Sequence, residues 1–143
     1  MKSDSPTDLG LPHRPPFLWL DRVQEHDPGK RVVATRFFGP EEPFFGGHFP
    51  GEPLVPGVIL CECMAQAAGI AANLPDRPPV AWRLTAIRQA KFHAPVFPDS
   101  TVEIEATAGN QLGALVQCHG RVVCEGTLVA EATLVLSRHE KAG

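Results

Sequence analysis

Residues 57–73 predict a helix that is apolar on every face. A helix with no polar stripe is buried, so the rest of the fold has to cover it on all sides. Only two strongly polar side chains, Glu62 and Gln66, occur in it before Asn73. They are four positions apart, so they share one helix face and can touch. A lone carboxylate in apolar surroundings is costly to keep, and Glu62 is therefore a candidate for chemistry.

The rest of the chain predicts antiparallel strands. The expected strands are residues 22–26, 30–38, 82–93, 101–107, 114–124 and 127–136, with turns at 27–29 and 125–126. One helix can cover such a sheet only if the sheet curves around it. We therefore expect the α+β class, with a curved antiparallel sheet wrapped around one long central helix. The length of 143 residues suits one domain over 1–143, with residues 1–10 as a loose tail.

Composition excludes several classes of function. The net charge of −3 argues against a nucleic-acid-binding protein. The four cysteines, at positions 61, 63, 118 and 124, have no metal-ligand spacing, so we expect no metal and reduced thiols in a cytoplasmic protein. The apolar segment is shorter than the roughly 20 residues of a membrane span, and no secretory signal opens the chain, so we expect no membrane insertion.

The loop before the helix holds one histidine, His48, between glycines and prolines. Glycine allows a close approach of a ligand and proline stiffens the chain, so the imidazole is held in place. Neutral imidazole is the usual general base near pH 7. Pro56 and Gly57 then begin the helix, where unpaired backbone N–H groups can bind a carbonyl oxygen.

A base, an acid and an oxyanion donor together favour proton abstraction next to a carbonyl group, with loss of a leaving group. Gln66 is more suited to orienting Glu62 than to exchanging protons. Cys61 and Cys63 are poor nucleophiles because apolar surroundings raise the pKa of a thiol. Two alternatives for Glu62 remain open, namely exposure to solvent at a kink and pairing with an arginine.

The segment 47–69, GHFPGEPLVPGVILCECMAQAAG, resembles the signature of the FabZ-type β-hydroxyacyl-acyl-carrier-protein dehydratases. In that signature His-Phe-Pro is followed by Pro-Gly-Val, then by Glu and Gln. Glutamate at position 62, in place of aspartate, resembles FabZ more than the related FabA dehydratase-isomerases. Similarity continues through residues 11–14, 16–18, 21–23, 91–92, 94–96 and 128–132.

This resemblance implies a hotdog fold and a dimer with two active sites at the interface, often assembled as a trimer of dimers. It implies that His48 of one chain faces Glu62 of the other. His48 would take the C2 proton of a (3R)-hydroxyacyl thioester, Gly57 N–H would hold the thioester oxygen, and Glu62 would help the hydroxyl leave. The substrate would be carried on the phosphopantetheine of acyl carrier protein, with no cofactor. Gln66 and Phe49 are further candidates for substrate binding.

The chain also departs from the family pattern. It has no tyrosine, so a tyrosine gate would need a replacement, and His93-Ala94 stands where an arginine is common. Candidates for docking the acidic carrier are Arg77, Arg83, Arg88, Lys91 and Arg121. Candidates for lining the acyl tunnel are Phe44, Phe45, Phe49, Met64 and Phe92.

Three other functions remain open at this point. One is a specialised dehydratase of a polyketide or unusual lipid pathway, with the same chemistry and a different carrier. Another is a hotdog thioesterase in which Glu62 activates water, although His48 in its HFPG loop is not typical of that class. The third is a non-catalytic scaffold subunit of a lipid assembly, against which an intact His48, Gly57 and Glu62 argue.

Overall fold

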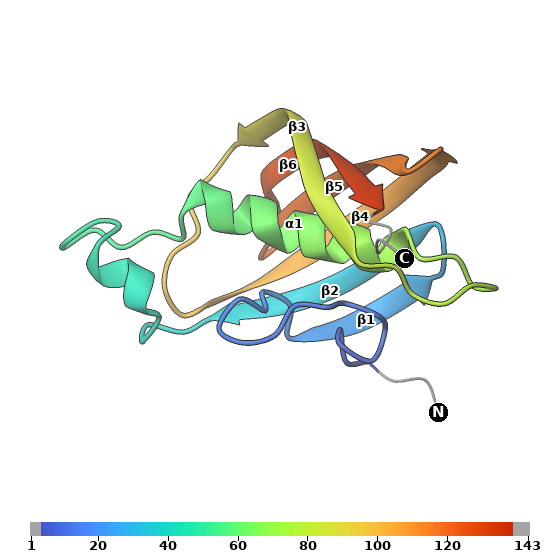
Figure 1. Ribbon diagram of the computed structural model, residues 1–143. Coiled ribbons are helices and arrows are strands. Elements are labelled where there is room, and N and C mark those ends of the chain that lie inside the picture. Colours follow the sequence, from blue (N-terminus) through green and yellow to red (C-terminus); the bar gives the residue numbers. More distant parts are fainter. Residues whose placement is uncertain (1–3, 139–143) are drawn as a thin grey trace.

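The computed structural model describes residues 4–138 as one curved antiparallel sheet and one long helix (Figure 1). The helix is α1 (Gly57–Ala71), and a short 3-10 helix, η1 (Pro43–Gly46), precedes it. The strands are β1 (Arg22–Asp27), β2 (Arg31–Phe38), β3 (Trp82–Phe92), β4 (Ser100–Leu112), β5 (Leu115–Cys124) and β6 (Thr127–Arg138). Their order across the sheet is β1-β2-β4-β5-β6-β3, and every neighbouring pair is antiparallel. The predicted architecture is confirmed.

The sheet curves around α1, which contacts β2, β3, β4, β5 and β6 (Figure 1). From Leu60 to Ala71 every side chain of the helix except Glu62 is buried. The first turn differs from the sequence expectation, because Val58 is 75% exposed. A single chain therefore buries the helix along most of its length and leaves its first turn and Glu62 partly uncovered. Within residues 4–138, no helix has the length and hydropathy to cross a bilayer.

The helix can lie close to the sheet because small residues line its path across the strands. Gly120 of β5 pairs with Ala106 of β4 and Ala132 of β6, and all three residues are buried. A Cβ atom on Gly120 would lie 2.8 Å from the Cβ and 2.9 Å from the Cγ of Met64 on the helix. The position therefore requires glycine for packing.

Strand boundaries agree with the sequence prediction except in β4. This strand continues to Leu112, whereas the alternation of apolar and polar residues predicted an end at Thr107. The added residues have weak strand propensity, yet they pair with β5 after an irregularity between Ala108 and Gln111. Pairing with a neighbouring strand extends β4 beyond what its own residues indicate.

One edge of the sheet is β3, which pairs only with β6 among the described strands. Most of its residues are exposed, including Leu84 at 40%, Ile87 at 45% and Phe92 at 52%. Apolar side chains on a free edge strand are typical of a surface that another chain covers.

Candidate active site

The loop that follows η1 projects from the body of the molecule, at the left of Figure 1, and His48 lies in this loop. Two hydrogen bonds hold this residue against Leu54. The Leu54 N–H donates to the His48 carbonyl oxygen at 2.8 Å, and the ring Nδ1 lies 3.2 Å from the Leu54 carbonyl oxygen. The His48 N–H also donates to the Phe44 carbonyl at 3.0 Å. The histidine is therefore fixed, as the glycines and prolines around it predicted.

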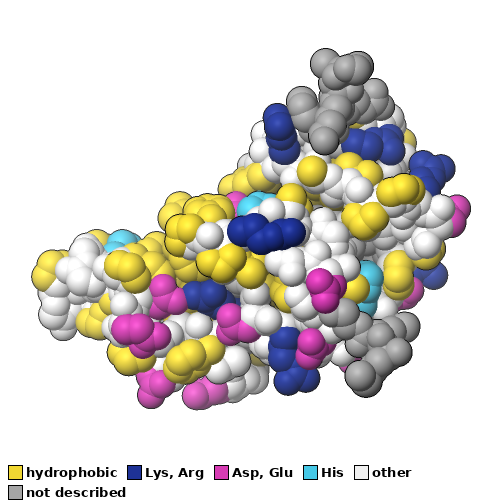
Figure 2. Space-filling model, turned by 60° about the horizontal axis from the view of Figure 1, so that its bottom comes forward, with side chains coloured by type: hydrophobic (Ala, Val, Ile, Leu, Met, Phe, Trp, Pro, Cys, Tyr) yellow, Lys and Arg dark blue, Asp and Glu magenta, His cyan; other side chains and the backbone are white. Residues whose placement is uncertain are grey.

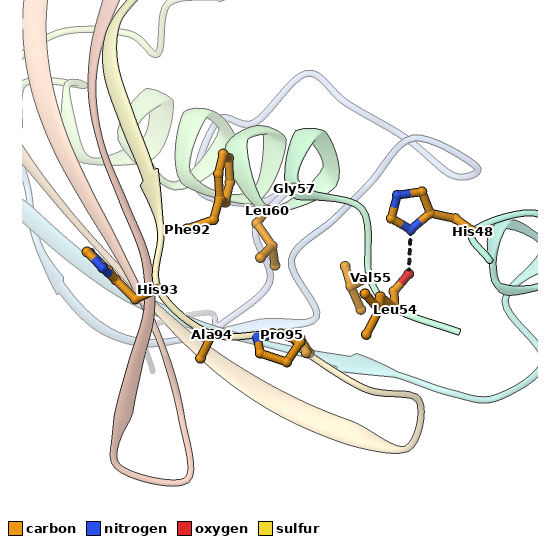
Figure 3. Close-up of a pocket in the computed structure, with 10 residues that line it drawn as sticks. His48, Leu54, Val55, Gly57, Leu60, Phe92, His93, Ala94 and Pro95 are labelled. Carbon is orange, nitrogen blue, oxygen red and sulfur yellow. Dashed lines mark hydrogen bonds between the residues drawn. The ribbon is translucent and has the colours of Figure 1, made fainter. Parts of the chain in front are cut away.

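These contacts determine which ring nitrogen of His48 is free. A carbonyl oxygen can only accept a hydrogen bond, so Nδ1 must carry the hydrogen that lies between them. The neutral ring then has an unprotonated Nε2, and Figure 3 shows this second nitrogen on the side of the ring away from Leu54. An imidazole whose Nδ1–H is bonded to the backbone has Nε2 available as a base.

His48 and Gly57 line the same cavity, of about 360 Å³ (Figure 3). The other lining residues are mostly apolar and come from the segment before α1, from α1 itself and from the end of β3 onward, among them Leu54, Leu60, Phe92 and Pro95. The Val55 N–H donates to the Val96 carbonyl at 2.8 Å and joins the two segments. A mostly apolar cavity with a few polar groups is typical of a binding site for a small molecule.

Gly57 has two properties that bear on this site. Its N–H is the first of the helix, and no hydrogen-bond acceptor for it is found among residues 4–138. A Cβ atom on Gly57 would also lie 3.0–3.3 Å from three ring atoms of Phe92. The glycine therefore allows the Phe92 ring to pack over the start of the helix while the N–H remains available. Gly57 can therefore both make room for the Phe92 ring and offer its N–H to an oxyanion.

Glu62 and Gln66 touch, as their spacing predicted. The Gln66 side-chain Nε2 donates to Glu62 Oε2 at 2.9 Å and to the Phe17 carbonyl at 2.9 Å, while its Oε1 accepts from the Trp19 N–H at 2.9 Å. Gln66 is 1% exposed, so these bonds determine the orientation of its amide. The Glu62 side chain is 20% exposed, so it is less buried than the sequence indicated. No arginine of the described chain pairs with it.

The residue that the sequence analysis missed is His13. Its Nε2 lies 3.7 Å from Glu62 Oε2, and its side chain is 29% exposed. His13 belongs to the opening segment 11–14, where only the family resemblance drew attention to it. Because 49 positions separate it from Glu62, no spacing rule could bring the two together.

His48 and Glu62 are not brought into one pocket by a single chain. The cavity that His48 and Gly57 line does not include Glu62 among its lining residues. Five positions separate Gly57 from Glu62, which in an α-helix corresponds to a rotation of about 140° around the axis. The carboxylate therefore points to another side of α1, toward His13 and the segment before β1.

The remaining candidates lie in different surroundings. The Phe49 ring stacks on the His48 ring, with centroids 4.1 Å apart, and is half exposed. Of the tunnel candidates, Phe92 lines the His48 cavity, whereas Phe45 and Met64 are buried in the core.

Burial raises the pKa of the Cys61 and Cys63 thiols, so neither suits a nucleophile. The four cysteines are free, and burial raises the pKa of Cys118 to about 11.

A family model described as the FabA-like domain matches residues 11–133. The chain belongs to the FabA-like family. Over 109 residues it is 46% identical to the 3-hydroxyacyl-[acyl-carrier-protein] dehydratase FabZ of Anaeromyxobacter sp. (strain K), covering 73% of this chain and 70% of that one. The FabZ of Geotalea uraniireducens is 50% identical over 99 residues, covering 66% and 68%. The predicted FabZ-type membership is therefore confirmed.

Solved structures support the fold. The Escherichia coli PaaI protein from the phenylacetic acid degradation operon superposes with a TM-score of 0.65, covering 81% of each chain at 20% identity. At this identity the likeness concerns the fold alone. The FabA-like match and this neighbour agree with the hotdog fold that the resemblance implied.

Proposed function

We propose that this chain dehydrates (3R)-3-hydroxyacyl thioesters carried on acyl carrier protein to trans-2-enoyl thioesters in type II fatty acid synthesis. Membership of the FabZ-type dehydratases makes it a hydro-lyase. The single observation that carries the mechanism is the arrangement of His48 and Gly57. A histidine with its Nδ1–H bonded to Leu54 shares one mostly apolar cavity with an unpaired helix N–H. A base and an oxyanion donor that face one cavity are what removal of a proton next to a thioester carbonyl requires.

The steps follow from the atoms available. The unprotonated Nε2 of His48 takes the proton from C2 of the substrate, and the charge that develops on the thioester oxygen is stabilised by the Gly57 N–H. The C3–O bond then breaks, the C2–C3 double bond forms, and the hydroxyl leaves as water after it receives a proton from Glu62. Gln66 holds the Glu62 carboxyl group. No bond to the protein forms, and no cofactor is required.

We propose that a second copy of the chain supplies Glu62 to the cavity of His48. Glu62 points to a side of α1 away from the cavity of His48, and none of the described residues that line this cavity is an Asp or a Glu. Three features support pairing of two copies: the exposed apolar side chains on edge strand β3, the exposed first turn of α1, and the projecting His48 loop (Figure 2). A homodimer would have two such sites. We further propose a trimer of dimers as its assembly and the cytoplasm as its location.

The function is tested by following the reverse reaction, hydration of a trans-2-enoyl group on acyl carrier protein. We expect the enoyl absorbance to fall with no release of free thiol, because water adds to the double bond while the thioester stays intact. Release of thiol without hydration would identify a thioesterase. Absence of any reaction over a series of chain lengths would favour a scaffold subunit.

Docking of the carrier gives a prediction on ionic strength. The five candidates Arg77, Arg83, Arg88, Lys91 and Arg121 are all exposed, and three of them are on β3, whose last residue Phe92 lines the cavity. We expect kcat/KM on the carrier-bound substrate to fall about five-fold between low and 0.3 M salt, since salt screens exposed charges. The control is an uncharged short thioester of the same acyl group, for which kcat/KM should not change. Equal salt dependence of both substrates would count against electrostatic docking.

A further inference from the structure

Two groups of the protein converge on the same oxygen of Glu62. The Gln66 Nε2 donates to Oε2 at 2.9 Å, and the His13 Nε2 lies 3.7 Å from that same oxygen. Neither contact involves Oε1. Because the amide nitrogen of Gln66 can only donate, Oε2 has to act as an acceptor. A carbonyl oxygen is a better acceptor than a hydroxyl oxygen, so in the protonated carboxyl group these contacts with Oε2 favour the hydrogen on Oε1.

The surroundings of His13 determine how it faces Glu62. Its Nδ1 is buried and has no hydrogen-bond partner among residues 4–138. A hydrogen on Nδ1 would be buried without an acceptor, which favours the neutral tautomer with the hydrogen on Nε2. That hydrogen is on the side of Glu62 Oε2. At 3.7 Å the contact is longer than a direct hydrogen bond, and a single water or a small rotation of either side chain would complete it.

The segment that carries His13 is held by contacts that do not involve Glu62. The Arg14 guanidinium donates to the carbonyl oxygens of Leu11 and His13, both at 2.8 Å. The His13 ring also stacks against Phe17, with centroids 6.5 Å apart. The Phe17 carbonyl in turn accepts a hydrogen bond from Gln66. The segment therefore meets the helix at two places, His13 beside Glu62 and Phe17 beside Gln66. His13 is thus presented to the carboxyl group by a fixed backbone.

We propose that His13 is a positioning residue that acts through Glu62. With Gln66 it holds Oε2 as an acceptor, so that Oε1 carries the proton and faces the leaving hydroxyl of the substrate. This inference rests on the proposed dehydration. The segment 11–14 would then take part in the reaction through His13. Glu62 would be held by His13 and Gln66, without an arginine partner.

The test compares substitutions that separate the ring from its N–H group. His13→Phe keeps the stacking on Phe17 and removes both nitrogens, and we expect kcat to fall roughly 10- to 100-fold with KM within about two-fold, because orientation of the acid is lost. His13→Gln restores an N–H donor, and kcat should return to within about three-fold of the wild type. His119→Phe, on the exposed face of β5, is the matched control and should leave kcat unchanged.

A double-mutant cycle shows whether His13 acts through Glu62. In a Glu62→Gln background, His13→Phe should cause no further loss, since the group that it positions is already absent. A wild-type kcat in His13→Phe would overturn the proposal, and so would losses that multiply in the double variant. Thermal unfolding shows whether the His13→Phe protein is folded. If it is not, His13→Asn replaces it in the cycle, since the shorter asparagine side chain does not reach Oε2 of Glu62.

The same measurements separate this inference from the proposed function. If the wild-type protein does not interconvert hydroxyacyl and enoyl substrates, the dehydratase function fails. If the wild type is active and His13→Phe equals it, only the role of His13 fails.

Discussion

His48→Ala and Glu62→Gln should each lower kcat roughly 10³-fold, because each removes a group that transfers a proton in the transition state. Alanine at 48 leaves the cavity without a base. Glutamine at 62 keeps the size of the side chain and can still contact Gln66, but it has no proton to give. The loss is measured as the rate of enoyl hydration on acyl carrier protein. Glu62→Gln activity near that of the wild type would show that the acid is another residue.

Combining the two variants in one dimer tests the shared site. A heterodimer of one His48→Ala chain and one Glu62→Gln chain has one site with both residues intact and one site with both changed. Purified by two different tags, it should recover about half of the wild-type activity per dimer, as two-fold symmetry requires. If both residues of a site came from one chain, each site would carry one change and no activity would return. Homodimers of each variant are the controls for assembly.

Gly120→Ala should lower the free energy of unfolding by about 1–3 kcal/mol, which is typical of an overpacked core. The added methyl group would lie 2.8 Å from Met64 Cβ, an atom that the helix backbone holds in place. Rotation of the flexible end of Met64 cannot relieve that contact, so α1 would have to move away from the sheet. Gly120→Val should cost more. Denaturant unfolding measures both changes.

The matched control is Gly46→Ala, the same substitution at a glycine where an added Cβ would meet nothing within 4 Å. Its backbone does not adopt a left-handed conformation, so its stability should remain within about 0.5 kcal/mol of the wild type. A Gly120→Ala protein as stable as this control would show that the helix can shift without loss of packing.

Much of the fold could be predicted because local patterns decide it. The apolar stretch of α1 and the alternation in β4 each report which faces are buried, and the turn at Glu125 and Gly126 has positive φ angles of 49° and 79°, as a two-residue hairpin requires. The end of β4 could not be predicted, since its last residues are strand only through their pairing with β5. The exposure of Val58 could not either, because an apolar pattern does not report which turn of a helix the sheet leaves uncovered.

For the site, the sequence predicted the contact of Glu62 with Gln66, because helical spacing brings them together. It did not predict the partners of the Gln66 amide in the segment before β1, nor the approach of His13 to Glu62. Both depend on how a segment without regular secondary structure packs against α1. No periodic pattern reports such packing.

The hydrogen bonds of Gln66 affect how this chain can change in evolution. In the segment before β1 the amide bonds to backbone atoms only, the Phe17 carbonyl and the Trp19 N–H. Substitutions of those two side chains therefore leave both bonds possible, whereas almost any substitution of Gln66 removes at least one. The side chains at positions 17 and 19 can therefore change without loss of these bonds, whereas Gln66 cannot. Residue covariation would fail to detect a contact of this kind, even though it holds the carboxyl group of Glu62 in place.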